Sequence, residues 1–448
     1  MRQAAGTQPR SGVGEPLGSV EEPLATAPAA EPQVRLWWVL VVGAALLRAA
    51  IMPYGGFPAD IATFKGWATA LAERGPRGFY GTGFADYLPG YLYVLWLIGA
   101  LHEHLRFNDQ ALLFLLKLPA SAADLLGAAL LRRVAERFTS SRTALLLAGL
   151  YLFHPALIFT GSYWGQSDSA GALLALAALA LFLGGDPLAW SAGAVAFLVK
   201  PQTAPLLAVL GTALVRRALW PPARPAGFRP RPDLVLGAAL IAALTAAVIG
   251  APFRVGPGRL AALVRNALGV YPYGSVVAFN LWGAVQGFWR SDGVRLARLP
   301  LVLWGSLLSA AGVAVVLIGT WRRPSGRGIV LAAAAVLVAT FLLPTRIHER
   351  YLLPALPFLA LGPAVDRRMW GPYIMLSGLL LLNLVYAYTR PYVQTFTPPG
   401  WIEGTLFSDP ATRVLSGMAL LALPWLIWIL WRPRPDPPTG APTRNGRA

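Results

Sequence analysis

Cysteine is absent from the 448 residues of this chain, and histidine and acidic residues are scarce. The absence of cysteine excludes disulfide bonds, thiolate nucleophiles and thiolate metal sites. The four histidines are too scattered to have the spacing of a metal site. Charged residues make up 13% of the chain, roughly half the share of an ordinary soluble protein. The chain therefore lacks the charged surface that a soluble domain of this size would carry.

Long apolar runs take the place of charge, and 56% of the residues are hydrophobic. A bilayer core of about 30 Å needs roughly 20 helical residues, so runs of about 18 or more predict membrane spans. Only helices satisfy their backbone groups within one segment in lipid. We count twelve or thirteen runs, depending on whether 188–217 holds one span or two. They are 36–52, 88–105, 111–131, 143–160, 168–185, 188–217, 233–250, 298–321, 327–344, 351–365, 369–388 and 413–431. The predicted fold is an all-α polytopic membrane protein.

The net charge of +18 comes largely from arginines in short loops between these runs. They are Arg132, Arg133, Arg137, Arg142, Arg216, Arg217, Arg224, Arg229, Arg231, Arg322, Arg323, Arg327, Arg367, Arg368, Arg432 and Arg434. This is the positive-inside pattern of cytoplasmic loops, and it argues against a nucleic-acid partner. It makes 143–160 run outward, so that 88–131 would cross the membrane once despite its two runs. Either one of those runs is interfacial or re-entrant, which we favour, or the 132–142 loop breaks the charge rule.

The apolar runs form one membrane domain, 35–432, between two polar tails. Residues 1–34 and 433–448 have the composition of disordered segments, and we expect them to be cytoplasmic. The long segments 53–87 and 251–297 are rich in Gly, Pro and aromatic residues. We expect them to form a partly ordered cap on the outer side of the membrane, with amphipathic helices in the first of them.

Two acids of the first outer segment are candidate catalytic groups. Asp60 begins an amphipathic stretch, "DIATFKGWATALAER", where it either caps a helix or holds a carboxylate that takes a proton from a hydroxyl. Asp86 and Tyr87 precede the run that begins at Pro89. Their alternative role is a helix start in an interfacial tyrosine belt.

A second polar group lies in "HPALIFTGSYWGQSDSAGALL", residues 154–174. Trp164, Gln166 and Asp168 offer an aromatic face, an amide and a carboxylate within five residues. That combination suits stacking on a sugar ring and hydrogen bonding to its hydroxyls. Alternatively, Ser167 or Asp168 simply caps the next helix.

Cations stand where a membrane protein rarely places them. Lys117 and Lys200 lie inside apolar runs, where a charge is costly and usually faces a cavity or a partner, unless it snorkels from a span end. Guanidinium groups in the turn after 327–344 suit a phosphate. Besides Lys117 and Lys200, the candidate binding residues of these motifs are Gln202, Asn280, Trp282, Arg346, His348, Glu349, Arg350 and Tyr351. Cations for a lipid phosphate and carboxylates for hydroxyls are what glycosyl transfer from a polyprenyl-phosphate sugar requires.

An ordered series of motifs over about residues 36–390 resembles the bacterial GT-C-fold integral-membrane mannosyltransferases that are similar to the second mannosyltransferase of GPI-anchor synthesis. The motifs are "ADIATFKGWATALAERGPRGFY", "DYLPGYLYVLWLIG", "LLKLPASAADLL", "HPALIFTGSYWGQSDS", "VKPQ", "FNLWG" and "RIHERYLLPALPFL". Leu88 stands where the family usually has a proline.

This resemblance implies a multi-pass cell-membrane enzyme of the GT-C type. It would transfer a hexose, typically mannose, from a polyprenyl-phosphate sugar to a glycan or glycolipid acceptor at the extracytoplasmic face. Asp60, with Asp86 next, matches the family's catalytic base. No Asp-X-Asp motif is present, so we expect no cofactor or metal requirement. The alternatives are a transporter or flippase of a lipid-linked sugar, and a lipid-linked glycan ligase or polymerase. A second copy of the 53–96 or 154–202 pattern, which a transporter's repeats would supply, is absent.

Overall fold

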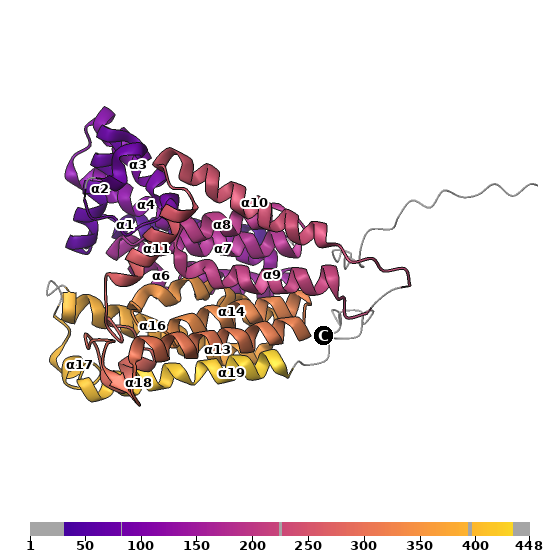
Figure 1. The fold of residues 1–448 in the computed structure, drawn as a ribbon. Helices are drawn as coiled ribbons and strands as arrows, with labels where there is room; N and C mark the ends of the chain where they lie inside the picture. The colour runs from indigo at the N-terminus through magenta and orange to yellow at the C-terminus, as the bar shows by residue number, and fades with distance from the viewer. Residues whose placement is uncertain (1–30, 82, 224–225, 393–396, 433–448) are drawn as a thin grey trace, which may run out of the picture.

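The computed structural model describes residues 31–432 apart from 82, 224–225 and 393–396. All twelve predicted runs are helical, so the all-helical fold class is confirmed (Figure 1). The helices are α1 (Glu31–Ile51), α2 (Pro58–Gly78), α3 (Pro89–Leu105), α4 (Asp109–Ala135), α5 (Ser141–Leu152), α6 (Pro155–Leu157), α7 (Asp168–Leu183), α8 (Leu188–Val199), α9 (Ala204–Leu219), α10 (Pro232–Gly250), α11 (Pro257–Gly269), α12 (Leu281–Gln286), α13 (Leu301–Arg322), α14 (Gly326–Leu342), α15 (Leu356–Val365), α16 (Trp370–Ala387), α17 (Gly400–Gly404), α18 (Asp409–Leu420) and α19 (Ala422–Trp431). Strands β1 (Arg295–Leu296) and β2 (Leu299–Pro300) form one antiparallel hairpin.

Short 3-10 or π-helical segments join several of these helices. They are η1 (Phe79–Gly81), η2 (Ile158–Trp164), η3 (Pro201–Thr203), η4 (Ala251–Phe253), η5 (Glu349–Ala355), η6 (Arg367–Met369) and η7 (Tyr388–Tyr392). The predicted tails lie outside the described residues except at 31–34. Those four residues are helical, which corrects the boundary at 34, and Pro32 fits there because the first turn of a helix needs no amide donor.

Seven helical segments are long and apolar enough to cross a membrane, judged by length and composition over the described residues. They are Pro32–Ile51, Asp109–Ala135, Ser141–Trp164, Pro232–Phe253, Leu301–Arg322, Arg367–Arg390 and Asp409–Trp431. Three shorter apolar helices, α7, α8 and α14, pack among them. The run 188–217 is two helices, because the chain leaves the helical conformation at Lys200 and Pro201 begins a new turn.

Helices α1 and α4 run antiparallel, which fixes the path of the chain between them. Arg48 of α1 contacts Asp124 of α4, while Lys117, about two turns earlier in α4, binds the carbonyl of Met52. The chain from 52 to 108 therefore begins and ends at one end of the bundle, and α2 and α3 lie at that end as well (Figure 1). α3 is part of that segment, so of the two runs in 88–131 only α4 passes from one end of the bundle toward the other. This is the alternative that the charge pattern favoured.

The arginine-rich loops gather at the other end of the bundle, here called the arginine end. Arg217 of α9 donates to the carbonyl of Pro324, Arg327 to that of Val365, and Arg323 to that of Leu430. These bonds join four different turns. These arginine-rich turns thus cluster at one end of the bundle, as predicted, and their side of the membrane stays a prediction. The opposite end, which carries 52–108 and 251–300, is called the loop end.

The core of the bundle is built around α14. Most of its side chains are fully buried, which is typical of a helix that is apolar on all faces. α10 instead lies at the edge of the bundle (Figure 1), and few residues of α10 or α13 are buried. Apolar side chains exposed along such helices suit contact with lipid tails.

The loop end is an ordered layer rather than free linkers. In α2, Phe64, Trp67, Ala68 and Leu71 recur at helical spacing and are buried against α3. α2 is thus the amphipathic helix predicted for the first outer segment. α11, α12 and the β1–β2 hairpin add to the layer from the second long segment. α2, α3, α11, α17 and α18 all lie at this end of the bundle (Figure 1).

Candidate active site

Side chains from five segments come together at the loop end. Asp60 comes from α2, Tyr87 from the turn before α3, and Lys200 from the break between α8 and α9. The segment 164–168 between η2 and α7 and the segment 348–351 at the start of η5 complete the group. Every one of these segments was singled out in the sequence, and the fold joins them through direct contacts.

The Asp60 carboxylate is held by two donors from the 154–168 segment. The indole Nε1 of Trp164 and the amide Nε2 of Gln166 both donate to Oδ2, at 2.8 and 2.5 Å. No bond to Oδ1 is present among the described residues. Asp60 does not cap α2, since Phe57 occupies the N-cap position without a side-chain cap bond and Pro58 begins the helix. The capping role predicted for Asp60 is therefore wrong, and its carboxylate points to another segment.

Trp164 supports Asp60 and does not offer an open face. Its side chain is fully buried, and its ring contacts those of Phe57, Phe159 and Tyr388 with centroids 5.2–6.1 Å apart. Stacking on a sugar ring requires an exposed face, so the stacking role predicted for Trp164 does not fit this geometry. The chain reverses after it at Gly165, which has a φ of 94°. A β-carbon there would lie 2.8 Å from Ile61, so both the backbone and the space favour glycine.

Lys200, Asp168 and Tyr87 form a second group directly beside the first. The Lys200 ammonium lies 3.4 Å from Asp168 Oδ2 and donates to the Tyr87 hydroxyl at 2.9 Å. It also sits 4.7 Å from the centre of the Tyr87 ring, a cation–π contact. Lys200 and Asp168 are buried, and the Asp168 oxygens accept no hydrogen bond from the described residues. This buried pair is neutral overall but has free acceptor positions.

The 348–351 segment adds a guanidinium, a carboxylate and an imidazole. Arg350 donates to Glu349 at 2.8 Å and lies 6.0 Å from the centre of the Trp164 ring. The ring of His348 contacts those of Tyr271 and Tyr351. Its two nitrogens have no hydrogen-bond partner among the described residues. Burial, reinforced by the nearby charges of Arg350 and Lys200, holds the His348 pKa well below its usual range. His348 is therefore neutral at pH 7, with one donor and one acceptor unused.

Asp86 is the second carboxyl group of the site. It is half-buried in the turn before α3, and burial raises its pKa above the usual range while the charges of Lys200 and Arg350 partly oppose that rise. Lys200 and Arg350 affect the pKa of Asp86 as they affect that of His348, so Asp86 lies near both cations. At a given pH, Asp86 is thus less ionised than an exposed aspartate.

Five predicted site residues are used elsewhere or lie at the edge. Lys117 donates to the carbonyls of Met52 and Tyr54 at the end of α1, although its stem lies beside Gly165. Arg346 pairs with Asp292 at 2.6 Å and binds the Leu268 carbonyl, which anchors the second long segment.

The other three residues have mainly backbone partners or none. Asn280 caps α12, and the Trp282 indole donates to the Leu343 carbonyl. Gln202 lies next to Lys200 in η3, with a buried side-chain oxygen that has no partner in the described part of the chain. The fold thus places Asn280 and Trp282 as supports for the loop end.

Several residues of the site were missed in the sequence. Tyr388 packs on Trp164 and donates to the Gly56 carbonyl, and Ser167 contacts the Tyr87 hydroxyl at 3.2 Å. Tyrosine and serine are too common near membrane interfaces to be distinguished by pattern. The buried Arg48–Asp124 pair between α1 and α4 was also missed. The sequence could have indicated this pair, because Arg48 and Asp124 are charges inside apolar runs, as Lys117 and Lys200 are.

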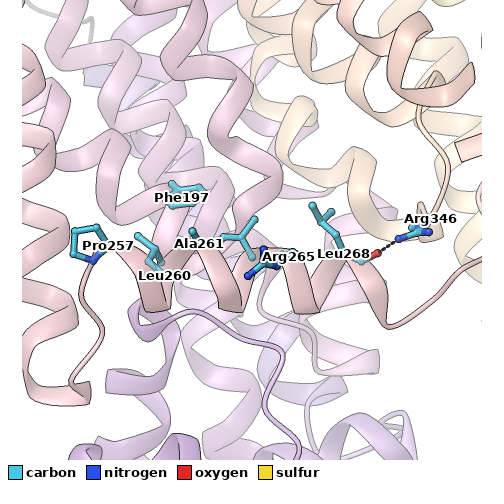
Figure 2. A pocket seen from close by; sticks show the side chains of 8 residues that line it. Phe197, Pro257, Leu260, Ala261, Arg265, Leu268 and Arg346 are labelled. Carbon is cyan, nitrogen blue, oxygen red and sulfur yellow. Dashed lines mark hydrogen bonds between the residues drawn. The ribbon is translucent and has the colours of Figure 1, made fainter. Parts of the chain in front are cut away.

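A pocket of about 660 Å³ is lined mainly by α11 of the loop end. It lies between α11 and α8, and Arg346 donates to the Leu268 carbonyl at its edge (Figure 2). Phe197 on its wall is three residues before Lys200, and Arg346 on its rim is two residues before His348. Its lining residues are Phe197, Pro257, Leu260, Ala261, Val264, Arg265, Leu268 and Arg346. The pocket is thus an apolar space with two guanidiniums, and two of the segments that line it also carry Lys200 and His348.

No three His, Asp or Glu side chains of the described residues come together in a group suited to a metal ion. The expectation that no metal is required remains a prediction.

Comparisons with known proteins give distant structural likenesses. No family model and no curated protein matches this sequence. The structure is similar to ArnT from Cupriavidus metallidurans bound to undecaprenyl phosphate, with 16% identity, a TM-score of 0.49, and coverage of 90% of this chain and 77% of that one. It is also similar to the Archaeoglobus fulgidus oligosaccharyltransferase tethered with an acceptor peptide, with 15% identity, a TM-score of 0.37, and coverage of 88% and 55%. Both TM-scores lie below 0.5, so the proposal below rests on the site geometry and the ordered motifs.

Proposed function

We propose that this chain is a membrane glycosyltransferase of the GT-C type that uses a polyprenyl-phosphate hexose. Its donor sugar is mannose, as the motif series suggests, and its acceptor is a lipid-linked or cell-envelope glycan. Transfer takes place at the loop end, which is the extracytoplasmic face if the arginine end is cytoplasmic.

One observation carries this proposal. Asp60 and Lys200, 140 positions apart in the sequence, are joined through Gln166 and Tyr87 at one end of the bundle, beside Arg350. A carboxylate with a free oxygen, near the buried Lys200 and the half-buried Arg350, is the arrangement that glycosyl transfer to a hydroxyl needs. A soluble phosphate-binding protein would have no need to place such a group of charges among apolar helices.

The reaction follows from these positions. Asp60 takes the proton of the acceptor hydroxyl, and the oxygen attacks the anomeric carbon of the donor. The bond between that carbon and the phosphate oxygen breaks, and the electron pair leaves with the polyprenyl phosphate. Lys200 and Arg350 stabilise the negative charge that develops on the phosphate. Attack opposite the leaving group inverts the anomeric configuration.

The remaining polar groups suit the sugar hydroxyls. Neutral His348 offers both a donor and an acceptor, while Asp168 and Glu349 have free carboxylate oxygens. A hydroxyl-rich ligand would satisfy these buried groups, and unpaired buried polar atoms are unfavourable without such a partner. Gln202 lies close enough along the chain to take part, with Tyr351 packing beside His348.

The pocket under α11 supports a lipid-linked donor. An apolar space of this size next to the cations would hold the isoprene units that adjoin the phosphate, and Arg265 lines it (Figure 2). We expect Ala261→Trp, which fills the pocket, to raise the donor KM about tenfold, or roughly 1.4 kcal/mol, while kcat changes little. Steady-state kinetics with donors of different chain length measures this.

Asn266→Trp is the matched control for the pocket variant, because Asn266 is on the same helix and is not among the lining residues. A water-soluble donor with a very short chain should be unaffected by Ala261→Trp. An equal rise in KM for short and long donors would contradict the placement of the lipid in this pocket.

The proposed function is tested with the purified protein in liposomes that contain radiolabelled polyprenyl-phosphate mannose and envelope glycolipids. We expect a new glycosidic product together with free polyprenyl phosphate in equal amounts. Movement of intact donor across the bilayer without a new bond would indicate a flippase instead. Transfer of a preassembled oligosaccharide, but not of a single sugar, would indicate a ligase.

A further inference from the structure

Tyr87 and Gln166 link Lys200 to Asp60 through three successive hydrogen bonds. The chemistry of the two end groups fixes the directions of these bonds. A lysine ammonium only donates, and an ionised carboxylate only accepts. The Tyr87 hydroxyl therefore accepts from Lys200, and the Gln166 amide nitrogen donates to Asp60. These two bonds fix the ends of the chain of contacts.

The middle of the chain then has one consistent arrangement. With its nitrogen toward Asp60, Gln166 presents its carbonyl oxygen 3.4 Å from the Tyr87 hydroxyl. The second lone pair of that hydroxyl is available to Ser167, 3.2 Å away, which leaves its proton for Gln166. Every donor then points from Lys200 toward Asp60.

Burial makes this arrangement specific. Gln166 and Ser167 are buried, while Tyr87 and Asp60 are half-buried, so water has limited access to these bonds. Successive hydrogen bonds in such a network polarise and strengthen one another. Gln166 and the Trp164 indole both bind Oδ2 of Asp60, which leaves Oδ1 without a partner among the described residues.

We propose that Tyr87 and Gln166 are positioning residues that form a directional hydrogen-bond chain from Lys200 to Asp60. The chain holds the carboxylate with Oδ1 toward the acceptor and ties its orientation to the ammonium that binds the donor phosphate. This inference rests on the proposed function. It replaces the predicted substrate contacts of Tyr87 and Gln166, because the polar atoms of both side chains are already occupied.

The test compares Tyr87→Phe and Gln166→Leu in the transferase assay. Tyr87→Phe removes the hydroxyl but keeps the ring on which the Lys200 ammonium sits. We expect kcat to fall about tenfold for Tyr87→Phe and about fiftyfold for Gln166→Leu, with the donor KM within about twofold. The double variant should be no worse than Gln166→Leu alone, because both changes break the same chain. Tyr93→Phe, which removes a hydroxyl that binds the Ile249 carbonyl, is the matched control and should keep its kcat.

Multiplicative losses in the double variant, or an unchanged kcat in both single variants, would overturn the chain while leaving the transferase function intact. If the wild type transfers no sugar, the proposed function fails, and thermal unfolding in detergent still tests the chain. In that measurement the Tm changes of Tyr87→Phe and Asp60→Asn should not add in the double variant. Additive changes would show that the two side chains are not connected.

Discussion

Asp60→Asn is expected to lower kcat about a thousandfold with little change in the donor KM. General base catalysis contributes roughly a hundredfold to ten-thousandfold, and asparagine cannot accept the acceptor's proton. Asparagine keeps the size of the side chain and an oxygen that can accept from the Trp164 indole, so the site should stay folded. Product formation from labelled donor in liposomes measures the effect.

Asp109→Asn is the control for this variant. Asp109 contacts α2 as well, through a largely exposed ion pair with Lys65, and should tolerate the change. Full activity of Asp60→Asn would show that the base is another group, with Asp86 the next candidate. Burial raises the pKa of Asp86, so a reaction that used it would lose activity at a higher pH, as the pH falls, than one that used a carboxylate of ordinary pKa. In Asp60→Asn, an acidic limb of the kcat profile that lies above the usual aspartate range would therefore identify Asp86 as the base.

Lys200→Met is expected to reduce kcat by about two to three orders of magnitude and also to destabilise the protein. The loss of rate follows from the loss of charge stabilisation at the departing phosphate. The loss of stability, roughly 3–5 kcal/mol, follows because the buried carboxylate of Asp168 would be left without its cation. Transferase kinetics and thermal unfolding in detergent measure the two effects separately.

The double variant Lys200→Met, Asp168→Asn separates folding from catalysis. It removes both buried charges, so stability should largely return while activity stays low. Lys65→Met removes an exposed lysine from α2 and serves as the control for loss of a positive charge. Recovery of activity in the double variant would show that Lys200 matters only for the fold and would contradict its role at the phosphate.

The helices were largely predictable because apolar length is a local property of the sequence. All twelve runs are helical, and the break at Lys200–Pro201 confirms the division of 188–217. The single crossing of 88–131 followed from the arginine pattern, although only the pairing of α1 with α4 fixed it. The start of α1 was placed a few residues late, because a polar first turn leaves no apolar signal.

The site was predictable in its members and only partly in their roles. The sequence analysis singled out Asp60 as an acid, Trp164 as an aromatic residue, Gln166 as an amide and Lys200 as a cation, each in or beside an apolar run. The sequence left a helix cap open beside the catalytic base for Asp60 and suggested a stacking face for Trp164, whereas the two side chains bind each other. Local spacing could not reveal this contact, since 104 positions separate the two residues.

The sequence by itself determined that this chain is a bundle of membrane helices with its arginine loops on one side and its polar motifs on the other. Hydrophobicity and charge decide this, because lipid excludes unpaired backbone groups and charges residue by residue. Only the tertiary structure decided which polar groups meet. It separated Lys200 and Arg350, which lie beside Asp60, from Lys117 and Arg346, which bind carbonyls or Asp292. That choice depends on how antiparallel helices pack and align, and such long-range contacts leave no trace in the local pattern.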